Sequence, residues 1–285
     1  MRKVLFDQSY DYLAKTALGL INSDRARYGA KPVTLSPVSC GQQHANTMFA
    51  FDYFSHWNHL GYKPYMRYTR MGGLGSMSEN VAWQKLTPAP RGPYSLDEVV
   101  RAIEQLEYDM MYNDTEWGNG HRDNILNPHH NRVSVGIAHG KRLGEMGIYF
   151  VEDFEDYYIE LETPFYIEGL VRLVGRKLKP LRLANVVVFR DGATRPINKK
   201  ALDRSRSYNP GMLVGGFVPP MSNMFFEGVT TAKAAVWVDN QESIRVEFSL
   251  KPLVDHFGPG VYTIYLRGRE NGETFTSLSI FNPKP

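Results

Sequence analysis

The sequence lacks several features that would place it in a specialised class of proteins. Its 285 residues include one cysteine, Cys40, so an intrachain disulfide is excluded, although the redox compartment does not follow from this. No apolar run approaches the roughly 18 residues of a membrane-spanning helix. The net charge of +3 is too small and too evenly spread to indicate a nucleic-acid partner. We therefore expect no integral membrane segment and no bound nucleic acid.

The amino terminus begins like a signal peptide but does not continue as one. Two basic and three apolar residues follow Met1, and Asp7 then interrupts before an apolar core of about 7–15 residues can form. The sequence thus holds no complete signal peptide. Either the chain starts at a mature domain with an added Met, or it is not exported by this route.

The overall composition is that of a globular protein, and the length suggests about two domains. Helical patterns are confined to the first half, where they predict helices at residues 10–28, 36–51, 95–112 and 121–126. The second of these is expected to open at the cap Ser36-Pro37, and the third at the capping box that starts at Ser95.

The remainder of the first half is predicted to be loop and hairpin. Residues 54–84 have little periodicity and are interpreted as a long ordered loop with one helical turn near 64–68. Residues 133–138 and 147–151 read as an antiparallel hairpin with its tip at 141–144. The first half is therefore α+β.

The second half is predicted to be all-β, because helical patterns stop after residue 155 and short strand-like runs recur between turn signals. We expect a β-sandwich with an immunoglobulin-like topology and a long polar loop at 198–223. The expected domains are residues 1–156 and 157–285. The predicted strands are residues 157–161, 166–173, 181–189, 234–238, 243–250, 261–266 and 274–281.

Four residues of the first half could carry chemistry. His56 and His121 lie in turn-rich segments, and Glu79 precedes an apolar run. At about 100° per residue, Glu107 falls within the apolar arc of its helix. There it either reaches solvent from the edge or faces a polar cleft, since a core carboxylate is costly unless paired. Two imidazoles and two carboxylates suffice for a divalent metal or for acid–base chemistry, although a histidine is more often a surface or hydrogen-bonding residue than a ligand.

Short motifs follow one another in a fixed order over roughly residues 10–155. They are Leu20-Ile21-Asn22-x-x-Arg25, Ala45-x-x-Met48, Phe54-Ser55-His56, Glu79-Asn80-Val81-Ala82, Gly120-His121-Arg122-Asp123-Asn124-Ile125-Leu126-Asn127-Pro128 and Val135-Gly136-Ile137. This series resembles the CAP superfamily (cysteine-rich secretory, antigen 5 and pathogenesis-related proteins, also called SCP-like) in its disulfide-free prokaryotic branch. The motif around His121 is the most specific.

The resemblance implies an α-β-α sandwich with a cleft lined by two His and two Glu. His56, Glu79 and His121 match three members of this tetrad, and Glu107 matches the helix glutamate better than Glu104. It also implies that His56 and His121 bind zinc or another divalent metal, which is not required for the fold. The sequence departs from the family pattern around His59, which is either an extra ligand or a loop residue.

Two functions remain open, because a fold does not determine a reaction. The first is an extracellular binding protein, secreted or on the cell surface, whose cleft takes a divalent metal and a small amphipathic (lipid-like) or peptide ligand. The alternative is a zinc-assisted hydrolase or peptidase in which Glu79 or Glu107 activates the water. Ser55 beside His56 offers no triad, since no Asp is placed to orient the imidazole. The oligomeric state does not follow from the sequence.

Overall fold

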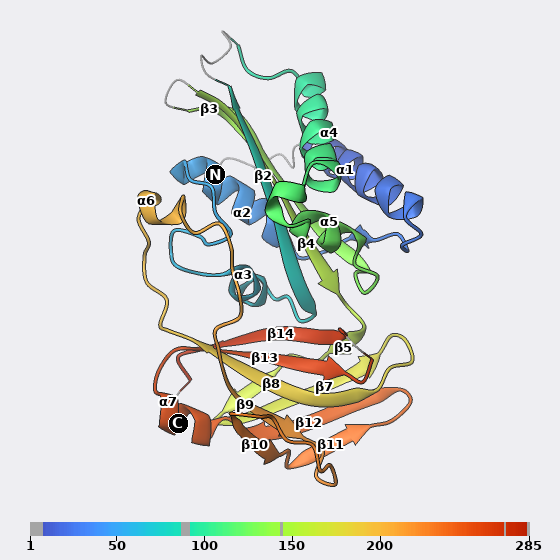
Figure 1. The fold of residues 1–285 in the computed structure, drawn as a ribbon, viewed down its shortest axis with the longest axis vertical. Coiled ribbons are helices and arrows are strands. Elements are labelled where there is room, and N and C mark those ends of the chain that lie inside the picture. Colours follow the sequence, from blue (N-terminus) through green and yellow to red (C-terminus); the bar gives the residue numbers. More distant parts are fainter. Residues whose placement is uncertain (1–7, 87–91, 143–144, 271, 284–285) are drawn as a thin grey trace. The chain divides into compact units, whose positions relative to one another are not determined.

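The computed structural model describes residues 8–86, 92–142, 145–270 and 272–283. The amino-terminal residues 1–7 and part of the expected hairpin tip, residues 143–144, therefore lie outside the described residues. The chain divides into two compact units, which are drawn in Figure 1. The first unit comprises Met1–Pro64, Ser78–Glu155 and Pro196–Ser207, and the second comprises Tyr65–Met77, Asp156–Arg195 and Tyr208–Pro285.

The first unit is built around a four-stranded sheet with strand order β1-β3-β4-β2. The strands are β1 (Thr34–Leu35), β2 (Ser76–Leu86), β3 (Arg132–Arg142) and β4 (Glu145–Asp156). The helices are α1 (Gln8–Arg27), α2 (Cys40–Phe51), α4 (Leu96–Tyr112), the 3-10 turn η1 (Thr115–Trp117), α5 (Gly120–Leu126) and α6 (Lys199–Leu202). β1 is parallel to β3, whereas β3 and β4 form the antiparallel hairpin that the sequence predicts.

The two faces of this sheet carry separate apolar cores. Ile137 and Phe150 belong to the core shared with α1 and α4. Their sequence neighbours Ala138 and Val151 belong to the core shared with Met48 of α2. Successive residues of a strand point to opposite faces, so this alternation places helices on both sides of the sheet. The expected α-β-α sandwich is confirmed, and Figure 1 shows α1 and α4 together on one side of it.

Helix α2 packs its backbone directly against β3. A side chain at Gly136 would overlap the carbonyl of Gly41, and one at Gly41 would overlap the carbonyl of Ser134. The Gln42 side chain fixes this close approach by donating to Ile137 O and accepting from Ile137 N, both at 2.8 Å. The glycine of the Val135-Gly136-Ile137 motif therefore has a packing role.

Two further motif residues hold the first unit together through buried polar contacts. The Asn22 side chain donates to Val33 O at 3.0 Å and accepts from Val33 N at 2.8 Å. Arg25, which is fully buried, donates from Nη1 and Nη2 to three carbonyls just after or at the end of α5. The acceptors are Ile125 O at 2.5 Å, Asn127 O at 3.1 Å and His130 O at 3.2 Å.

Most predicted helices are confirmed, but two local predictions are wrong. The second helix begins at Cys40 and not at Ser36, because the Ser36 hydroxyl accepts from Val38 N and bonds Glu155. The helical turn expected near 64–68 is confirmed as α3 (Pro64–Arg70), but the expected loop at 54–84 also contains most of β2. Strand β2 escapes pattern recognition because buried positions such as Glu79 and Asn80 are polar, which removes the usual alternation.

The second unit is β-rich, with two sheets of order β10-β9-β8-β13-β14 and β11-β12-β7-β5, and β6 paired to β7. The strands are β5 (Ile159–Leu161), β6 (Phe165–Ile167), β7 (Leu170–Lys177), β8 (Leu183–Asp191), β9 (Met212–Val218), β10 (Thr230–Lys233), β11 (Val236–Asp239), β12 (Ser243–Ser249), β13 (Val261–Gly268) and β14 (Thr274–Phe281). The expectations of no helix after residue 155 and of a loop over 198–223 are wrong, since α6 and α7 (Lys251–Phe257) are helical and β9 occupies 212–218.

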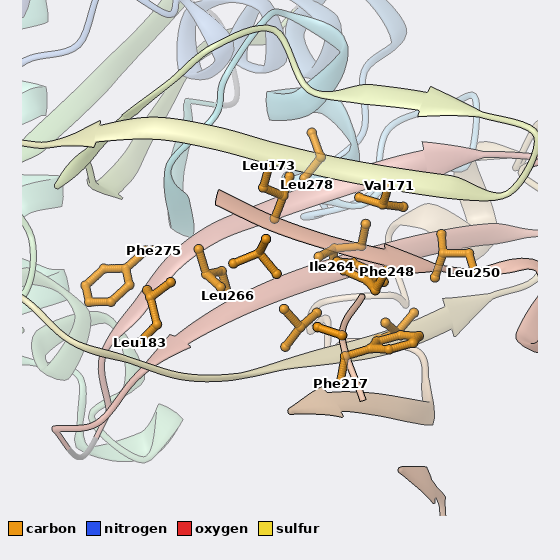
Figure 2. Close-up of a cluster of buried hydrophobic side chains, with 14 of the residues drawn as sticks. Val171, Leu173, Leu183, Phe217, Phe248, Leu250, Ile264, Leu266, Phe275 and Leu278 are labelled. Atoms are coloured by element: carbon orange, nitrogen blue, oxygen red, sulfur yellow. The ribbon is translucent and has the colours of Figure 1, made fainter. Parts of the chain in front are cut away.

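The core of the second unit lies between its two sheets. Leu173 of β7 and Phe248 of β12 come from one sheet, and Ile264 and Leu266 of β13 come from the other. All four are at most 1% exposed. Figure 2 shows these side chains gathered in one apolar layer, as a β-sandwich requires.

Candidate functional site

A cavity of about 240 Å³ opens in the first unit, and both predicted histidines line it. His56 follows α2 in the chain, and His121 is the second residue of α5. Two segments that are 65 residues apart in the sequence therefore line the same cavity. The described residues that line it are Phe54, His56, Val81, Ala82, Trp83, Leu106, Asp109, Met110, Asn113, Asp114, His121 and Arg206.

His56 is oriented by the first predicted glutamate. Its Nδ1 lies 2.9 Å from Glu79 Oε1, and the two side chains are 11% and 0% exposed. An ionised carboxylate can only accept, so Nδ1 carries the hydrogen and the contact fixes both the tautomer and the ring orientation. Glu79 thus stands behind the imidazole and does not belong to the lining of the cavity.

His121 has an equivalent carboxylate partner, Asp114, which the sequence analysis missed. His121 Nδ1 lies 2.6 Å from Asp114 Oδ1. The other oxygen, Oδ2, accepts from the backbone N–H groups of His121 at 2.8 Å and Arg122 at 3.2 Å. Asp114 is 2% exposed. Through these hydrogen bonds its carboxylate holds both the imidazole and the first turn of α5 in place.

Glu107 lies in the interior and does not reach solvent from the edge of its helix. It is 2% exposed, and no donor among the described residues bonds either of its oxygens. Its neighbour is the fully buried Glu152 of β4. Burial, and then the charge of Glu152, raises the pKa of Glu107 well above its ordinary value. Two carboxyls in such contact cannot both ionise readily, so the pair retains a proton.

The two carboxyls differ in their donors: Asn80 stabilises the charged form of Glu152, whereas no donor among the described residues does so for Glu107. Burial raises the pKa of Glu152 above its ordinary value, and the hydrogen bond from Asn80 opposes this shift. Asn80 Nδ2 donates to Glu152 Oε2 at 3.1 Å and to His121 O at 3.1 Å. Asn80 Oδ1 accepts from Asn124 Nδ2 at 2.9 Å. A continuous polar network thus links the carboxyl pair to the backbone of His121.

The apolar part of the cavity comes from aromatic and aliphatic side chains. The Phe54 and Trp83 rings lie with their centroids 5.6 Å apart, and Val81 and Met110 add aliphatic surface. Arg206 lines the same cavity, and its guanidinium carbon lies 5.8 Å from the centroid of the Phe54 ring. The site therefore combines two oriented imidazoles, an apolar wall and one cation.

Ser55 and His59, which the sequence analysis also considered as candidate site residues, have structural roles. The Ser55 hydroxyl donates to Ser205 O at 2.5 Å and accepts from Trp57 N at 3.1 Å, so it stabilises a turn. His59 stacks on Phe51 with a centroid distance of 4.0 Å, and partial burial lowers its pKa. His59 is not part of the lining and behaves as a loop residue.

The donor set does not fit a protein-enclosed zinc site. Zinc in proteins takes three or four side-chain ligands, and catalytic sites keep one position for water. Within the described part of the chain, no group of three or more His, Cys, Asp or Glu side chains could hold a metal ion. His56 and His121 would supply two nitrogen ligands. The carboxylates of Glu79 and Asp114 already contact the Nδ1 atoms of these two histidines.

The described helices include none that is both long and apolar enough to cross a membrane. A comparison with curated proteins found no match. The model of the CAP family, described as the cysteine-rich secretory protein family, matches residues 18–154.

Two solved structures are also similar to part of the chain. One is an extracellular protein containing a SCP domain from Bacillus anthracis str. Ames, with 21% identity and a TM-score of 0.35, covering 50% of this chain and 39% of that one. The other is the CAP domain of Enterococcal PrgA, with 14% identity and a TM-score of 0.34, covering 48% of this chain and 58% of that one. This chain thus spans less than two thirds of either.

The helix–sheet–helix layers, the ordered motifs and the cavity with two histidines define the class of the first unit. Residues 18–154 belong to the CAP family, in a disulfide-free form with a β-rich region in the second half of the chain.

Proposed function

We propose that the cavity of the CAP domain binds a small amphipathic ligand, with its polar group between His56 and His121. The observation that carries this proposal is the composition of the cavity wall. Two imidazoles oriented by carboxylates face the same hollow as Phe54, Trp83 and Met110. Binding sites of small molecules typically combine an apolar wall with a few placed polar groups.

The size of the cavity limits the ligand. About 240 Å³ is below the range of about 300–1,000 Å³ that drug-sized ligands occupy. The occupant is therefore a small molecule, or one end of a larger one such as a peptide or a lipid-like chain.

Hydrolysis is the less favoured function. The carboxylates that would activate a water, Glu79 and Glu107, are 5% and 2% exposed and are not part of the cavity lining. A general base must lie within hydrogen-bond reach of the proton that it abstracts. Glu79 Oε1 instead bonds His56, and the burial of Glu107 beside Glu152 raises its pKa and so disfavours its basic form.

We further propose that the protein acts outside the cell or on its surface. The description of the matched family as secretory supports this location. Immunodetection in the producing organism should find the chain in the medium or on intact cells, and recovery from the cytosol alone would contradict the proposal.

The binding proposal is tested with 3-phenylpropanamide, a neutral molecule with an aromatic ring and one amide. In a two-dimensional NMR titration, amide and indole signals of Phe54, His56, Trp83 and His121 should shift together and saturate. The variant His121→Ala should weaken the binding at least tenfold, because the polar end of the probe loses its partner. His129→Ala, outside the cavity, is the matched control and should bind normally. Absence of shifts at these signals would refute the proposal.

A further inference from the structure

The cavity is completed by a segment from far along the chain, residues 196–207, which we call the strap. It lies between β8 and β9 in the sequence, yet it belongs to the first unit. Its short helix α6 places Leu202, 1% exposed, in the apolar core that also contains Met48 and Tyr53. The strap is thus an integral part of the first unit.

Hydrogen bonds near residue 206 attach the strap to the loop that carries His56. Phe54 N donates to Asp203 Oδ1 at 3.0 Å, and Ser55 Oγ donates to Ser205 O at 2.5 Å. Trp57 Nε1 donates to Ser207 O at 3.2 Å. Because these contacts flank residue 206 on both sides, they fix the position of the Arg206 backbone beside the cavity.

Arg206 is the cation of the cavity wall, and its charge is not neutralised by a carboxylate among the described residues. Its Nε donates to the backbone carbonyl of Asp203 at 3.2 Å, and its guanidinium lies over Phe54. The two acids of the lining have other partners. Asp109 Oδ1 accepts from Gln105 at 3.0 Å and Asn113 at 2.7 Å, and Asp114 is held by His121.

We propose that Arg206 is a specificity-determining residue that selects ligands ending in a carboxylate. This inference rests on the proposed function and names the chemical class of its ligand. The planar guanidinium binds a carboxylate through two parallel hydrogen bonds. A carboxylate brings a single negative charge, and Asp109 and Asp114 in the same wall repel it less than they repel a doubly charged phosphate. Phe54, beneath the guanidinium, provides the adjoining apolar contact.

The test compares 3-phenylpropionate with 3-phenylpropanamide, which has the same ring and chain but no charge. At pH 7.5 and low salt, calorimetry on the full chain should give a dissociation constant about three- to tenfold lower for the acid. The factor is modest because Arg206 is exposed and solvent screens its charge. In Arg206→Gln the two constants should become equal, and Arg206→Lys should retain part of the preference.

Arg204→Gln is the matched control, because Arg204 is exposed on the same strap but does not line the cavity. It should keep the full preference for the acid. A second pair of probes separates the two sources of a carboxylate: octanoate with octanamide, and N-acetyl-glycyl-phenylalanine with its carboxyamide. Tighter binding of octanoate indicates an acyl chain, and tighter binding of the peptide acid indicates a peptide carboxyl terminus.

The outcomes distinguish this inference from the proposed function. Equal affinity of the wild type for acid and amide, or a preference that survives Arg206→Gln, overturns the role of Arg206 while binding in the cavity stands. If neither phenyl probe binds the wild type, the proposed function fails and the inference fails with it.

Discussion

The two units differ in how their interiors accommodate buried charged groups. The second unit packs apolar side chains between two sheets, and the buried Lys177, Glu247 and Glu273 each contact an opposite charge, as Lys177 contacts Asp239 at 2.5 Å. The first unit instead buries Arg25 among backbone carbonyls and Glu107 beside another carboxyl. Other buried acids of the first unit contact residues of the cavity lining, as Glu79 contacts His56 and Asp114 contacts His121.

The largest expected effect follows from removing the buried cation of the first unit. Arg25→Ala removes the guanidinium hydrogen bonds to Ile125 O, Asn127 O and His130 O. We expect this loss to lower the free energy of unfolding by about 3 kcal/mol or more. Hydrogen exchange read by mass spectrometry should increase first in α5 and the residues that follow it.

The matched change in the second unit is Phe248→Ala, which should cost about 3–5 kcal/mol through a cavity in an apolar core. Its exchange should increase first in β12 and β7, which are paired. If Arg25→Ala instead accelerated exchange in β12 and β7 as much as in α5, the contrast between the two interiors would be lost.

The substitution Glu107→Gln is expected to stabilise the protein, by less than Arg25→Ala and Phe248→Ala destabilise it. The folded-state pKa of Glu107 is raised, chiefly by burial, so the folded protein binds more protons than the unfolded chain above the unfolded value of about 4.3. Its contribution to stability is therefore complete at acidic pH and decreases as the pH rises. Glutamine imitates the protonated acid at every pH, so the variant should melt about 3–6 °C higher than the wild type at pH 8.

The comparison at pH 4.5 is the internal control, since both proteins are then neutral at position 107 and should melt at similar temperatures. Glu104→Gln, on the exposed face of the same helix, should leave the melting temperature unchanged at both values. A wild-type melting temperature that rises between pH 5 and 8, with no gain from Glu107→Gln, would contradict the protonated pair.

The smallest expected effect concerns metal removal. Because the described residues offer no set of three ligands, dialysis against a chelator should change neither the melting temperature nor the binding of 3-phenylpropanamide. The measurement is thermal unfolding and calorimetry before and after dialysis, with zinc restored in a third sample. A chelator-dependent fall of several degrees that zinc reverses would show that the site holds a metal.

The sequence was sufficient to predict features that depend on local periodicity. The capping box at Ser95 and the inward position of Glu107 both follow from the pattern of a single helix, and both are confirmed. Glu152 was missed, although a period of two predicts it on the same face as Phe150 and Phe154, both of which lie in the core shared with α4.

Other parts of the site depend on contacts between distant segments. Asp114 occupies an ordinary turn-rich stretch, and only the folding of η1 and α5 brings its carboxylate to His121. Arg206 follows a short helix in a polar segment for which the sequence predicts a loop, and no local pattern assigns it to the first unit. Such residues become visible only when the tertiary path of the chain is known.

The strap has a consequence for the order in which the protein matures during synthesis. Leu202 and Arg206 leave the ribosome only after all of β3, β4 and the first strands of the second unit have been made. A nascent chain that stops at residue 156 therefore has every CAP motif but an unfilled core position and an open cavity wall. The wall of the cavity is therefore completed late in translation, after the other segments of the first unit have been made.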